Sequence, residues 1–499
     1  MRARQTTPAN AGAALVCLLL GGLQTLGFAP VNAWYLQILA LAGLVGVLRQ
    51  APAKQAALYA WLFAAGWLAS GFWWITISLH RYGGLPLGLS WLAVLLLGAA
   101  LALYYALAIY VFARWRSGVA WRDALLFAAL WTLAELARAT IFTGFPWIAQ
   151  GYAHVEGPMA AYAPWIGVYG IGALAAWLSA SLGLSIGAWK PFLRVGLTTV
   201  ALVLGLAWVL PQDFTQDAGR LKVSLLQTNV PQDEKFEPTR LLQSLSDSLS
   251  LIHQAKGDFV LTPESMLPVL PEQIDPAWWA AARAPFNTPQ RALMIGTFLG
   301  NPERGYTNSL ITLSATEPYR YGKRHLLPFG EMIPPGFGWL MAMINVPIGD
   351  QLHGQVTAPF VLGGQRIRPL ICYEDLFGED FAAQMVGPDA PTLLANASNL
   401  AWFGTAMIQD QHLQFSQMRA LEFQRPVIRS TNTGATAVVD HRGRITARLP
   451  ADMRGILEAV VQGRSGATPY ACWLAFWGLW PLATLCLVLI VALYRRSSP

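Results

Sequence analysis

The chain has 499 residues, of which 55% are hydrophobic and only 12% are charged. This composition excludes a single soluble domain, because such domains carry about a quarter of their residues as charged side chains. The formal net charge of +7 is explained by basic loops at a membrane surface, so we expect no nucleic-acid partner.

Acidic residues divide the chain into three parts. Before residue 211 there are only three of them, Asp123, Glu135 and Glu156, and none follows residue 470. The middle part, of about 250 residues, is long enough to bury a full core. The predicted domains are a membrane domain at 1–211, an α/β domain at 212–469, and a last transmembrane helix with a cytoplasmic tail at 470–499.

Apolar runs predict eight transmembrane helices, because one span needs roughly 20 apolar residues. Seven precede the α/β domain and one follows it. The predicted spans are 10–28, 32–48, 56–78, 87–113, 123–143, 163–188, 194–211 and 471–494. The first run resembles a signal peptide, but no convincing cleavage site follows it, so we expect it to be retained.

Basic residues in the short loops predict the orientation of these spans. One set of alternate loops is rich in them: Arg2, Arg4, Arg49, Lys54, Arg114, Arg116, Arg122, Lys190, Arg194, Arg495 and Arg496. The other set has only Arg81 and Arg138. The positive-inside rule places the first set in the cytoplasm. Both termini are then cytoplasmic, and the α/β domain faces the periplasm from the inner membrane of a bacterium.

Two ionisable residues lie inside the fifth predicted span. Glu135 and Arg138 are three residues apart, so they share one face of a helix, and the sequence Thr-Gly-Phe-Pro-Trp at 143–147 follows them. Ionisable groups at membrane depth are candidates for function. The alternative is an ion pair that only holds the following loop, and both interpretations stay open.

Short β-rich runs alternate with helical segments in the middle part. The predicted strands are 221–227, 258–262, 292–297, 308–313, 367–372, 392–396, 427–431 and 435–439. The predicted helices are 238–256 and 406–424. This alternation predicts an α/β domain with buried sheets.

Three segments of this domain carry reactive side chains where a predicted element ends. They are Leu261-Thr-Pro-Glu-Ser265, the stretch 321–331 with Lys323 and Glu331, and Ile371-Cys-Tyr-Glu374. A thiol needs a base or a positive neighbour to act as a nucleophile, and acyl transfer needs a donor for its oxyanion. Glu264, Lys323 and Cys372 offer these groups. The alternative for Cys372 is a buried core cysteine.

In this order and spacing, the three segments resemble the Glu-Lys-Cys triad of the nitrilase (carbon–nitrogen hydrolase) superfamily. Further matching segments are 396–404, Met418-Arg-Ala-Leu-Glu422, Arg425-Pro426 and Thr431-Asn-Thr-Gly434. Together with the spans and the sequence at 143–147, they make the whole chain similar to the apolipoprotein N-acyltransferases, the last enzymes of bacterial lipoprotein maturation.

The resemblance implies an α/β nitrilase-like domain with four layers, α-β-β-α, on an all-α membrane base. It also implies acyl transfer from a membrane phospholipid, through a thioester on Cys372, to the N-terminal amine of a diacylglyceryl-cysteine. Glu264 is then the general base and Lys323 the oxyanion donor. Glu331, Glu374 and Tyr373 support the site in such enzymes.

Other expectations concern partners and substrate contacts. We expect lipid or substrate contacts at Phe236, Trp339, Leu340, Asn399 and Trp402. His325 is expected to be a structural hydrogen-bonding residue. No metal-ligand spacing or phosphate loop is present in the sequence, so neither a metal nor a cofactor is expected. The partners expected are the phospholipid donor, the apolipoprotein acceptor and the membrane, with the chain as a monomer.

Three residues depart from the pattern of the family. Thr228 stands where a glycine is usual, Phe236 where Trp is frequent, and Leu400 where an acidic residue is usual. None of them belongs to the triad. Three other functions stay open: a membrane-anchored amidase or nitrilase acting on a soluble amide, a transporter or lipid-binding protein with an inactive domain, and an acyltransferase with another amine acceptor.

Overall fold

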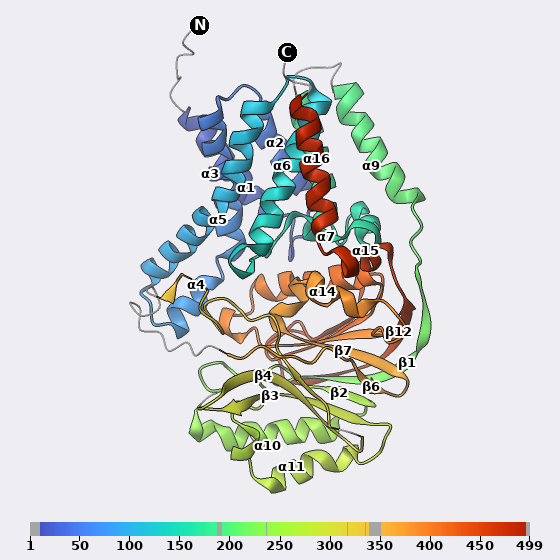
Figure 1. Cartoon of the computed structure of the whole chain (residues 1–499). Coiled ribbons are helices and arrows are strands. Elements are labelled where there is room, and N and C mark those ends of the chain that lie inside the picture. The colour runs from blue at the N-terminus through green and yellow to red at the C-terminus, as the bar shows by residue number, and fades with distance from the viewer. Residues whose placement is uncertain are drawn as a thin grey trace. The chain divides into compact units, whose positions relative to one another are not determined.

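The computed structural model describes residues 10–186, 192–235, 237–316, 318–334, 336–338 and 351–495 (Figure 1). The chain forms two compact units. The helical unit contains residues up to Gln212 and from Trp477 onward, and the α/β unit is Asp213–Phe476. Helix α15 (Pro469–Trp477) therefore lies almost wholly in the α/β unit. This unit ends at Phe476, seven residues beyond the boundary at 469 that the sequence predicts.

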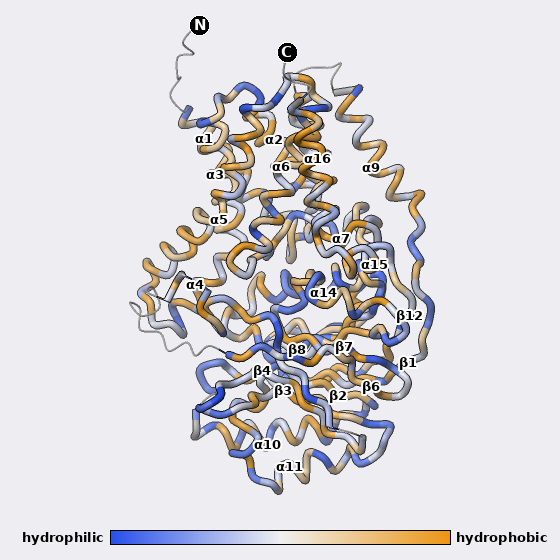
Figure 2. Tube along the Cα trace, in the orientation of Figure 1, coloured by the Kyte–Doolittle hydropathy of each residue, from blue (hydrophilic) through white to orange (hydrophobic). Residues whose placement is uncertain are grey.

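The helical unit is built from runs rich in Leu and Ala, which are strong helix formers. Figure 2 shows apolar residues along the full length of these helices. Helix α3 packs against α1 and α5, and α6 packs against α5, α7 and α16. The main helices are α1 (Ala11–Thr25), α2 (Trp34–Leu48), α3 (Ala53–Phe72), α4 (Ile75–Ile77), α5 (Leu87–Trp115), α6 (Ala120–Thr140), α7 (Ala163–Ser185), α9 (Thr198–Val209) and α16 (Trp480–Arg495).

Not all of these helices are long enough to cross a membrane. Among the described residues, three pass by length and composition: Leu87–Trp115, Ala120–Thr143 and Pro158–Ser185. The number rises to five if each of two bent helix pairs is one span, Ala53–Phe72 with Ile75–Tyr82 and Pro469–Trp477 with Trp480–Tyr494. The eight predicted spans are therefore not confirmed, because the other apolar helices have fewer than 18 residues.

The two ionisable residues of α6 hold the loop that follows it. Arg138 Nη1 donates to the carbonyl oxygens of Phe145 at 2.6 Å and Trp147 at 2.9 Å. Glu135 Oε1 accepts from the backbone N–H of Gln150 at 2.8 Å and lies 3.9 Å from Arg138 Nη2. Both side chains are fully buried. The interpretation as a loop anchor therefore has direct support in these contacts.

The α/β unit contains two six-stranded mixed sheets. The first has the order β12-β1-β2-β3-β4-β5, and the second has the order β11-β10-β9-β8-β7-β6. Strands β1, β2 and β3 run parallel, as do β7, β8 and β9. The strands are β1 (Thr215–Gln227), β2 (Phe259–Leu261), β3 (Ala292–Asn301), β4 (Gly305–Ser314), β5 (Arg320–Gly322), β6 (Phe360–Leu362), β7 (Gln365–Ile371), β8 (Leu393–Ser398), β9 (Val427–Thr431), β10 (Ala437–Val439), β11 (Ile445–Arg448) and β12 (Gly455–Gly466).

The sheets pack face to face, and helices cover their outer faces. Strand β1 shows why, since Leu221, Val223 and Leu225 join the core between the sheets while Leu226 faces the outer helices. This period of two is the alternation of a strand buried on both sides. Helices α10 (Pro238–Gln254) and α11 (Pro276–Arg283) cover the first sheet, and α14 (Ile408–Phe423) covers the second (Figure 1).

The predicted elements of this unit match the structure closely. The predicted strand 427–431 coincides with β9, and the predicted helix 406–424 contains α14. Strand β1 begins six residues before its predicted start, because polar residues there pair with β12 at a sheet edge. Four layers follow in the order helices, sheet, sheet, helix.

Candidate active site

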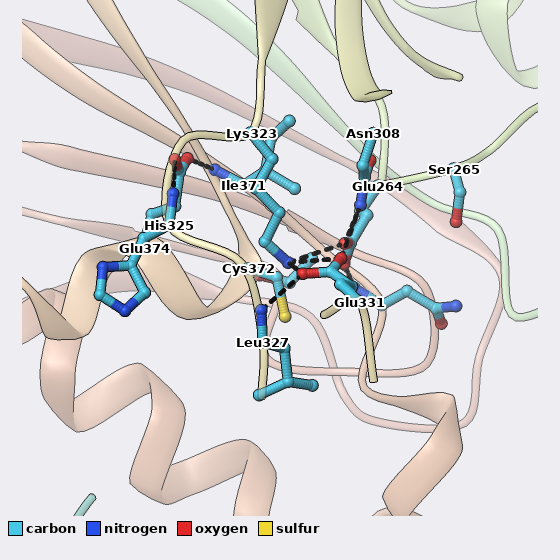
Figure 3. A network of polar contacts seen from close by, with 12 residues as sticks. Glu264, Ser265, Asn308, Lys323, His325, Leu327, Glu331, Ile371, Cys372 and Glu374 are labelled. Atoms are coloured by element: carbon cyan, nitrogen blue, oxygen red, sulfur yellow. Dashed lines mark hydrogen bonds and ion pairs between the residues drawn. The ribbon is translucent and has the colours of Figure 1, made fainter. Parts of the chain in front are cut away.

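The three reactive segments come together where strands of the two sheets end (Figure 3). Glu264 follows β2 by three residues, and Lys323 comes directly after β5, both in the first sheet. Cys372 comes directly after β7, in the second sheet. In Figure 3 the sulfur of Cys372 lies beside the side chains of Lys323, Glu264 and Glu331. The residues that sequence reasoning selected therefore form one cluster.

Cys372 occupies a turn that its own side chain disfavours. It begins the short 3-10 helix η8 (Cys372–Leu376), and its φ is +51°. A residue other than glycine in this region is strained by about 1–3 kcal/mol and stays there only if its surroundings hold it. Asn396 Nδ2 donates to the carbonyl oxygen of Cys372 at 3.0 Å. The turn thus aims a partly buried thiol away from the strand and toward the cluster.

Both oxygens of Glu264 are held in place. Asn308 Nδ2 donates to Oε1 at 2.7 Å, and the backbone N–H of Asn399 donates to Oε2 at 2.8 Å. Lys323 Nζ lies 3.6 Å from Oε1. The carboxylate is buried and fixed, which is the state that a general base needs for aimed proton transfer.

Lys323 is bound mainly by Glu331. Its Nζ donates to Glu331 Oε1 at 2.8 Å and lies 2.8 Å from Oε2. Oε2 also accepts from the backbone N–H of Leu327 at 2.8 Å, and Oε1 accepts from Asn308 Nδ2 at 3.2 Å. Asn308 therefore joins the two carboxylates through one amide group. Glu331 fixes the ammonium group without a direct bond to the thiol.

Burial and charge set the protonation of the two reactive groups. Burial raises the pKa of the Cys372 thiol, and the Glu264 carboxylate raises this pKa further, while Lys323 acts in the opposite direction. Burial by itself lowers the pKa of Lys323, but Glu331 and Glu264 outweigh it, so its pKa lies above the ordinary range. At neutral pH the site therefore holds a thiol and an ammonium ion.

Glu374 connects the nucleophile turn to the lysine segment. Its Oε2 accepts from the backbone N–H of Ile371 at 2.6 Å, and its Oε1 accepts from the backbone N–H of Arg324 at 2.7 Å. Tyr321 Oη also donates to it, at 2.9 and 3.0 Å. Burial raises the pKa of Glu374, while these backbone hydrogen bonds lower it. One carboxylate therefore sets the position of Lys323 relative to Cys372.

Tyr373 and His325 fill the space beside this connection. The ring of Tyr373 packs edge-on against His325, and the His325 ring stacks on Phe377 with centroids 3.5 Å apart. His325 Nδ1 lies 2.6 Å from Asp380 Oδ2. His325 is thus engaged in structural contacts, and Tyr373 lies beside the nucleophile.

The residues expected to contact substrate have mixed positions. Asn399 gives its backbone N–H to Glu264, and its side chain binds Gln232 at 2.8 Å and Asn432 at 3.0 Å. Trp402 lies in the 3-10 helix η10 (Ala401–Phe403) and is 37% exposed. The other three expected contacts, Phe236, Trp339 and Leu340, lie outside the described residues.

Sequence reasoning missed two polar residues of the site. One is Asn308, an amide inside strand β4 that the sequence does not distinguish from the other polar residues of that strand. The other is Lys235, whose Nζ donates to the carbonyl oxygen of Glu264 at 3.3 Å and to Ser265 Oγ at 3.0 Å. Burial lowers the pKa of Lys235 to about 8. In the part of the chain that the structure describes, no three His, Cys, Asp or Glu side chains group as a metal would require.

Comparison with known proteins decides the family. The family model for the apolipoprotein N-acyltransferase N-terminal domain matches residues 20–181, and the carbon–nitrogen hydrolase family model matches residues 222–470. The apolipoprotein N-acyltransferase of Verminephrobacter eiseniae is 43% identical over 89% of this chain and 89% of its own length. That of Ralstonia nicotianae is 45% identical over 92% of this chain and 89% of its own length.

The chain belongs to the apolipoprotein N-acyltransferase family. Among solved structures, a carbon–nitrogen hydrolase superfamily protein from Xanthomonas campestris is 18% identical, covers 49% of this chain and 91% of its own, and has a TM-score of 0.38. Both parts of an apolipoprotein N-acyltransferase are therefore matched along this chain, the N-terminal membrane part and the carbon–nitrogen hydrolase part.

Proposed function

We propose that this protein transfers an acyl chain from a membrane phospholipid to the N-terminal amine of a diacylglyceryl-modified cysteine of an apolipoprotein. Membership in the family carries the choice of reaction. The cluster of a thiol, a fixed carboxylate and an ammonium ion carries the mechanism. An amidase acting on soluble amides would use the same triad, but it would have no need of the apolar helices that the chain carries.

The first half-reaction forms a thioester on Cys372. The thiol is protonated at rest, so Glu264 takes its proton as the sulfur attacks the ester carbonyl of the phospholipid. The negative charge that develops on the carbonyl oxygen is stabilised by the Lys323 ammonium ion. When the intermediate collapses, Glu264 returns the proton to the leaving alkoxide of the lysophospholipid. The acyl group stays on sulfur.

The second half-reaction moves the acyl group to nitrogen. The α-amine of the lipoprotein cysteine attacks the thioester, and Glu264 accepts a proton from the attacking nitrogen. Lys323 again faces the oxyanion. The Cys372 thiolate leaves and takes the proton back from Glu264, so the resting site is restored and the product is an amide. No other proton donor is required.

The remaining site residues support these steps. Glu331 keeps Lys323 charged and aimed, since it binds the ammonium ion with both oxygens. Glu374 holds the Lys323 segment and the Cys372 turn at a fixed separation. Tyr373 follows the nucleophile in the chain, and its ring packs against Phe377. We assign Phe236, Trp339, Leu340 and Trp402 to contacts with acyl chains, and Asn399 to positioning of the base through its backbone N–H.

The membrane arrangement of the proposal has eight spans. The three long helices, the two bent pairs and the three shorter apolar helices correspond one to one to the eight predicted spans. With this number the basic loops and both termini are cytoplasmic, and the domain at 212–469 faces the periplasm from the inner membrane. The protein then works as a monomer on a lipid donor and a lipid-modified acceptor, which share one membrane.

The decisive experiment is to trap the thioester. Purified protein is incubated with phospholipid but no acceptor, and the mass of the peptide that carries Cys372 is measured. The expected result is one acyl group on this peptide that hydroxylamine removes and that Cys372→Ala lacks. If a folded protein with an alkylatable Cys372 gains no acyl group, the phospholipid donor is wrong and soluble amides become the substrates to test.

A further inference from the structure

A second buried ion pair lies next to the nucleophile turn, and the mechanism above does not use it. Asp375 lies in η8, three residues after Cys372, and Arg429 lies in β9. Asp375 Oδ2 and Arg429 Nη1 are 2.9 Å apart, and neither side chain is exposed by more than 1%. A buried Arg–Asp pair is costly to desolvate, so its retention calls for a reason beyond stability.

Helix α14 completes this pair. Ser416 Oγ donates to Asp375 Oδ2 at 2.7 Å, and Arg429 Nη1 donates to Ser416 Oγ at 2.8 Å. The guanidinium group also contacts the carbonyl oxygen of His412 at 3.3 Å and its ring nitrogen Nδ1. Because guanidinium only donates, Nδ1 accepts and His412 is neutral. Three elements, η8, β9 and α14, are thereby tied together at one point.

A second route runs from Arg429 to the main chain of the nucleophile. Arg429 Nη2 donates to Ser398 Oγ at 3.5 Å, and Ser398 Oγ donates to Asn396 Oδ1. Asn396 Nδ2 then donates to the carbonyl oxygen of Cys372 at 3.0 Å. The order matters, because the Ser398 hydroxyl donates to Oδ1 and so leaves the NH2 group of Asn396 facing the carbonyl oxygen of Cys372. Arg429 therefore supports the turn at two places. One is Asp375 in η8, and the other is the carbonyl oxygen of Cys372, which it reaches through Ser398 and Asn396.

The turn needs such support. The φ of Cys372 is +51°, a conformation that favours glycine. A nucleophile in such a turn keeps its orientation only if both ends of the turn are held. Glu374 holds the turn on the side of Lys323. The contacts of Asp375 and Asn396 hold it on the side of α14 and β8.

We propose that Asp375 and Arg429 are positioning residues, which hold the strained Cys372 turn in the geometry for attack on the acyl ester. This inference rests on the proposed thioester mechanism. It assigns both residues an action through the turn and through Asn396, not a contact with substrate. Ser416 and His412 complete the same support from α14.

The electrostatics of the site distinguishes a positioning role of Asp375 from a direct effect of its charge on the thiol. Among the described residues, the charged and titratable groups that act on Cys372 are Glu264, Lys323, Glu331, Asp375, His412 and Arg429. Burial raises the pKa of the thiol, and Asp375 is among the carboxylates that raise it further. Removing the charge of Asp375 therefore lowers the thiol pKa. A direct electrostatic role predicts a faster nucleophile, and a positioning role predicts a slower reaction.

The test uses the full chain in detergent with Asp375→Asn. Two quantities are measured: the pH midpoint of Cys372 alkylation and the single-turnover rate of thioester formation from phospholipid. We expect the midpoint to fall while thioester formation slows about 10- to 100-fold, because small misplacements of a reacting group have effects of this size. Asp410→Asn is the control, since Asp410 lies on α14, pairs with Arg448 of β11 at 2.7 Å and should change neither quantity.

Two further variants guard against misfolding. Ser416→Ala removes only a neutral hydrogen-bonding group, so it should fold and slow thioester formation about threefold, as expected for one hydrogen bond. Arg429→Lys keeps the charge without the planar fork and should retain more activity than Arg429→Gln.

Unchanged or faster thioester formation in folded Asp375→Asn and Ser416→Ala would overturn the inference. Failure of the proposed function is distinguishable, because the unsubstituted protein would then form no thioester although its Cys372 still reacts with the alkylating reagent.

Discussion

The helical unit and the α/β unit each bury a cation beside carboxylates or carbonyls, but they use it differently. In the helical unit, Arg138 gives its hydrogen bonds to two loop carbonyls and to Tyr105 Oη at 3.1 Å. In the α/β unit, Lys323 binds Glu331 closely and Glu264 at the longer distance of 3.6 Å. Arg138 thus gives two of its hydrogen bonds to backbone carbonyls and one to a tyrosine, whereas among the described residues the partners of Lys323 are carboxylate side chains.

The comparison distinguishes a cation that anchors a loop from the cation that we propose to act in catalysis. The Arg138 guanidinium donates to two carbonyls of the loop that follows α6, and so it fixes that loop. An ammonium held by one bidentate carboxylate keeps its charge in a site that also contains a base and a thiol. Both clusters are buried and hold a cation beside a carboxylate, so burial and charge alone do not identify the active site. The hydrogen-bond partners of the cation are needed as well.

The largest effect is expected from Cys372→Ser. A hydroxyl in the same turn is a far poorer nucleophile than a thiol, so turnover should fall at least about 1,000-fold. Activity with phospholipid and a diacylglyceryl peptide is the measurement, with Cys472→Ser as the control because Cys472 is exposed on α15. Substantial turnover in Cys372→Ser would mean that another group accepts the acyl chain.

Glu264→Gln should come next, with a loss of about 100- to 10,000-fold in both half-reactions. Glutamine keeps the size of the side chain but has only one acceptor oxygen, so it can keep the hydrogen bond from Asn308 or the one from the backbone N–H of Asn399, but not both. It cannot take the proton of a thiol that is protonated at neutral pH. Raising the pH should partly restore thioester formation, since hydroxide then makes the thiolate. A variant whose rate falls equally at every pH would argue that Glu264 only positions the site.

Lys323→Met tests the buried cation that we propose to act in catalysis. Loss of the oxyanion donor should lower turnover about 100- to 1,000-fold. The pH midpoint of Cys372 alkylation should also rise, because Lys323 lowers the thiol pKa against the raising effects of burial and Glu264. The direction of this shift is the test. If the pH midpoint of Cys372 alkylation fell or stayed constant, Lys323 would not act on the thiol. Glu331→Gln should lower turnover less than Lys323→Met does. Its alkylation midpoint should fall rather than rise, because the Glu331 carboxylate raises the thiol pKa.

The sequence predicted eight strands of the α/β unit, but β5, β6, β11 and β12 were not among them. The alternation of β1 follows from the period of a strand, and β9 was predicted to the residue. Glu264 and Cys372 were selected because each stands at the end of a predicted strand, and Lys323 was selected because its segment resembles the family. Such features are local, so one stretch of chain is enough to recognise them.

Apart from Glu331, Glu374 and Tyr373, which the resemblance implied, the support of the site could not be predicted, because it depends on pairings far apart in the chain. Asn308 reaches Glu264 across 44 residues, and Arg429 reaches Asp375 across 54. Tyr321 binds Glu374 only because β5 and η8 meet in space. The positive φ of Cys372 is also invisible in a sequence that has no glycine there. The eight predicted spans are not confirmed for a related reason, since composition does not show where an apolar run bends or breaks.

The smallest effect on turnover is expected from Arg138→Gln, which tests the structural cation. It leaves the buried Glu135 carboxylate without its partner and frees the carbonyls of Phe145 and Trp147, so the free energy of unfolding should fall by about 3–5 kcal/mol. Thermal unfolding in detergent measures this loss. Turnover per folded molecule should stay within a few-fold of the unsubstituted protein, because Arg138 reaches no reacting group through its described contacts. Arg138→Lys keeps the charge and should lose less stability. If Arg138→Gln instead kept its stability and lost turnover, Arg138 would act in catalysis as Lys323 is proposed to do. The hydrogen-bond partners of a buried cation would then not distinguish a structural anchor from a catalytic group.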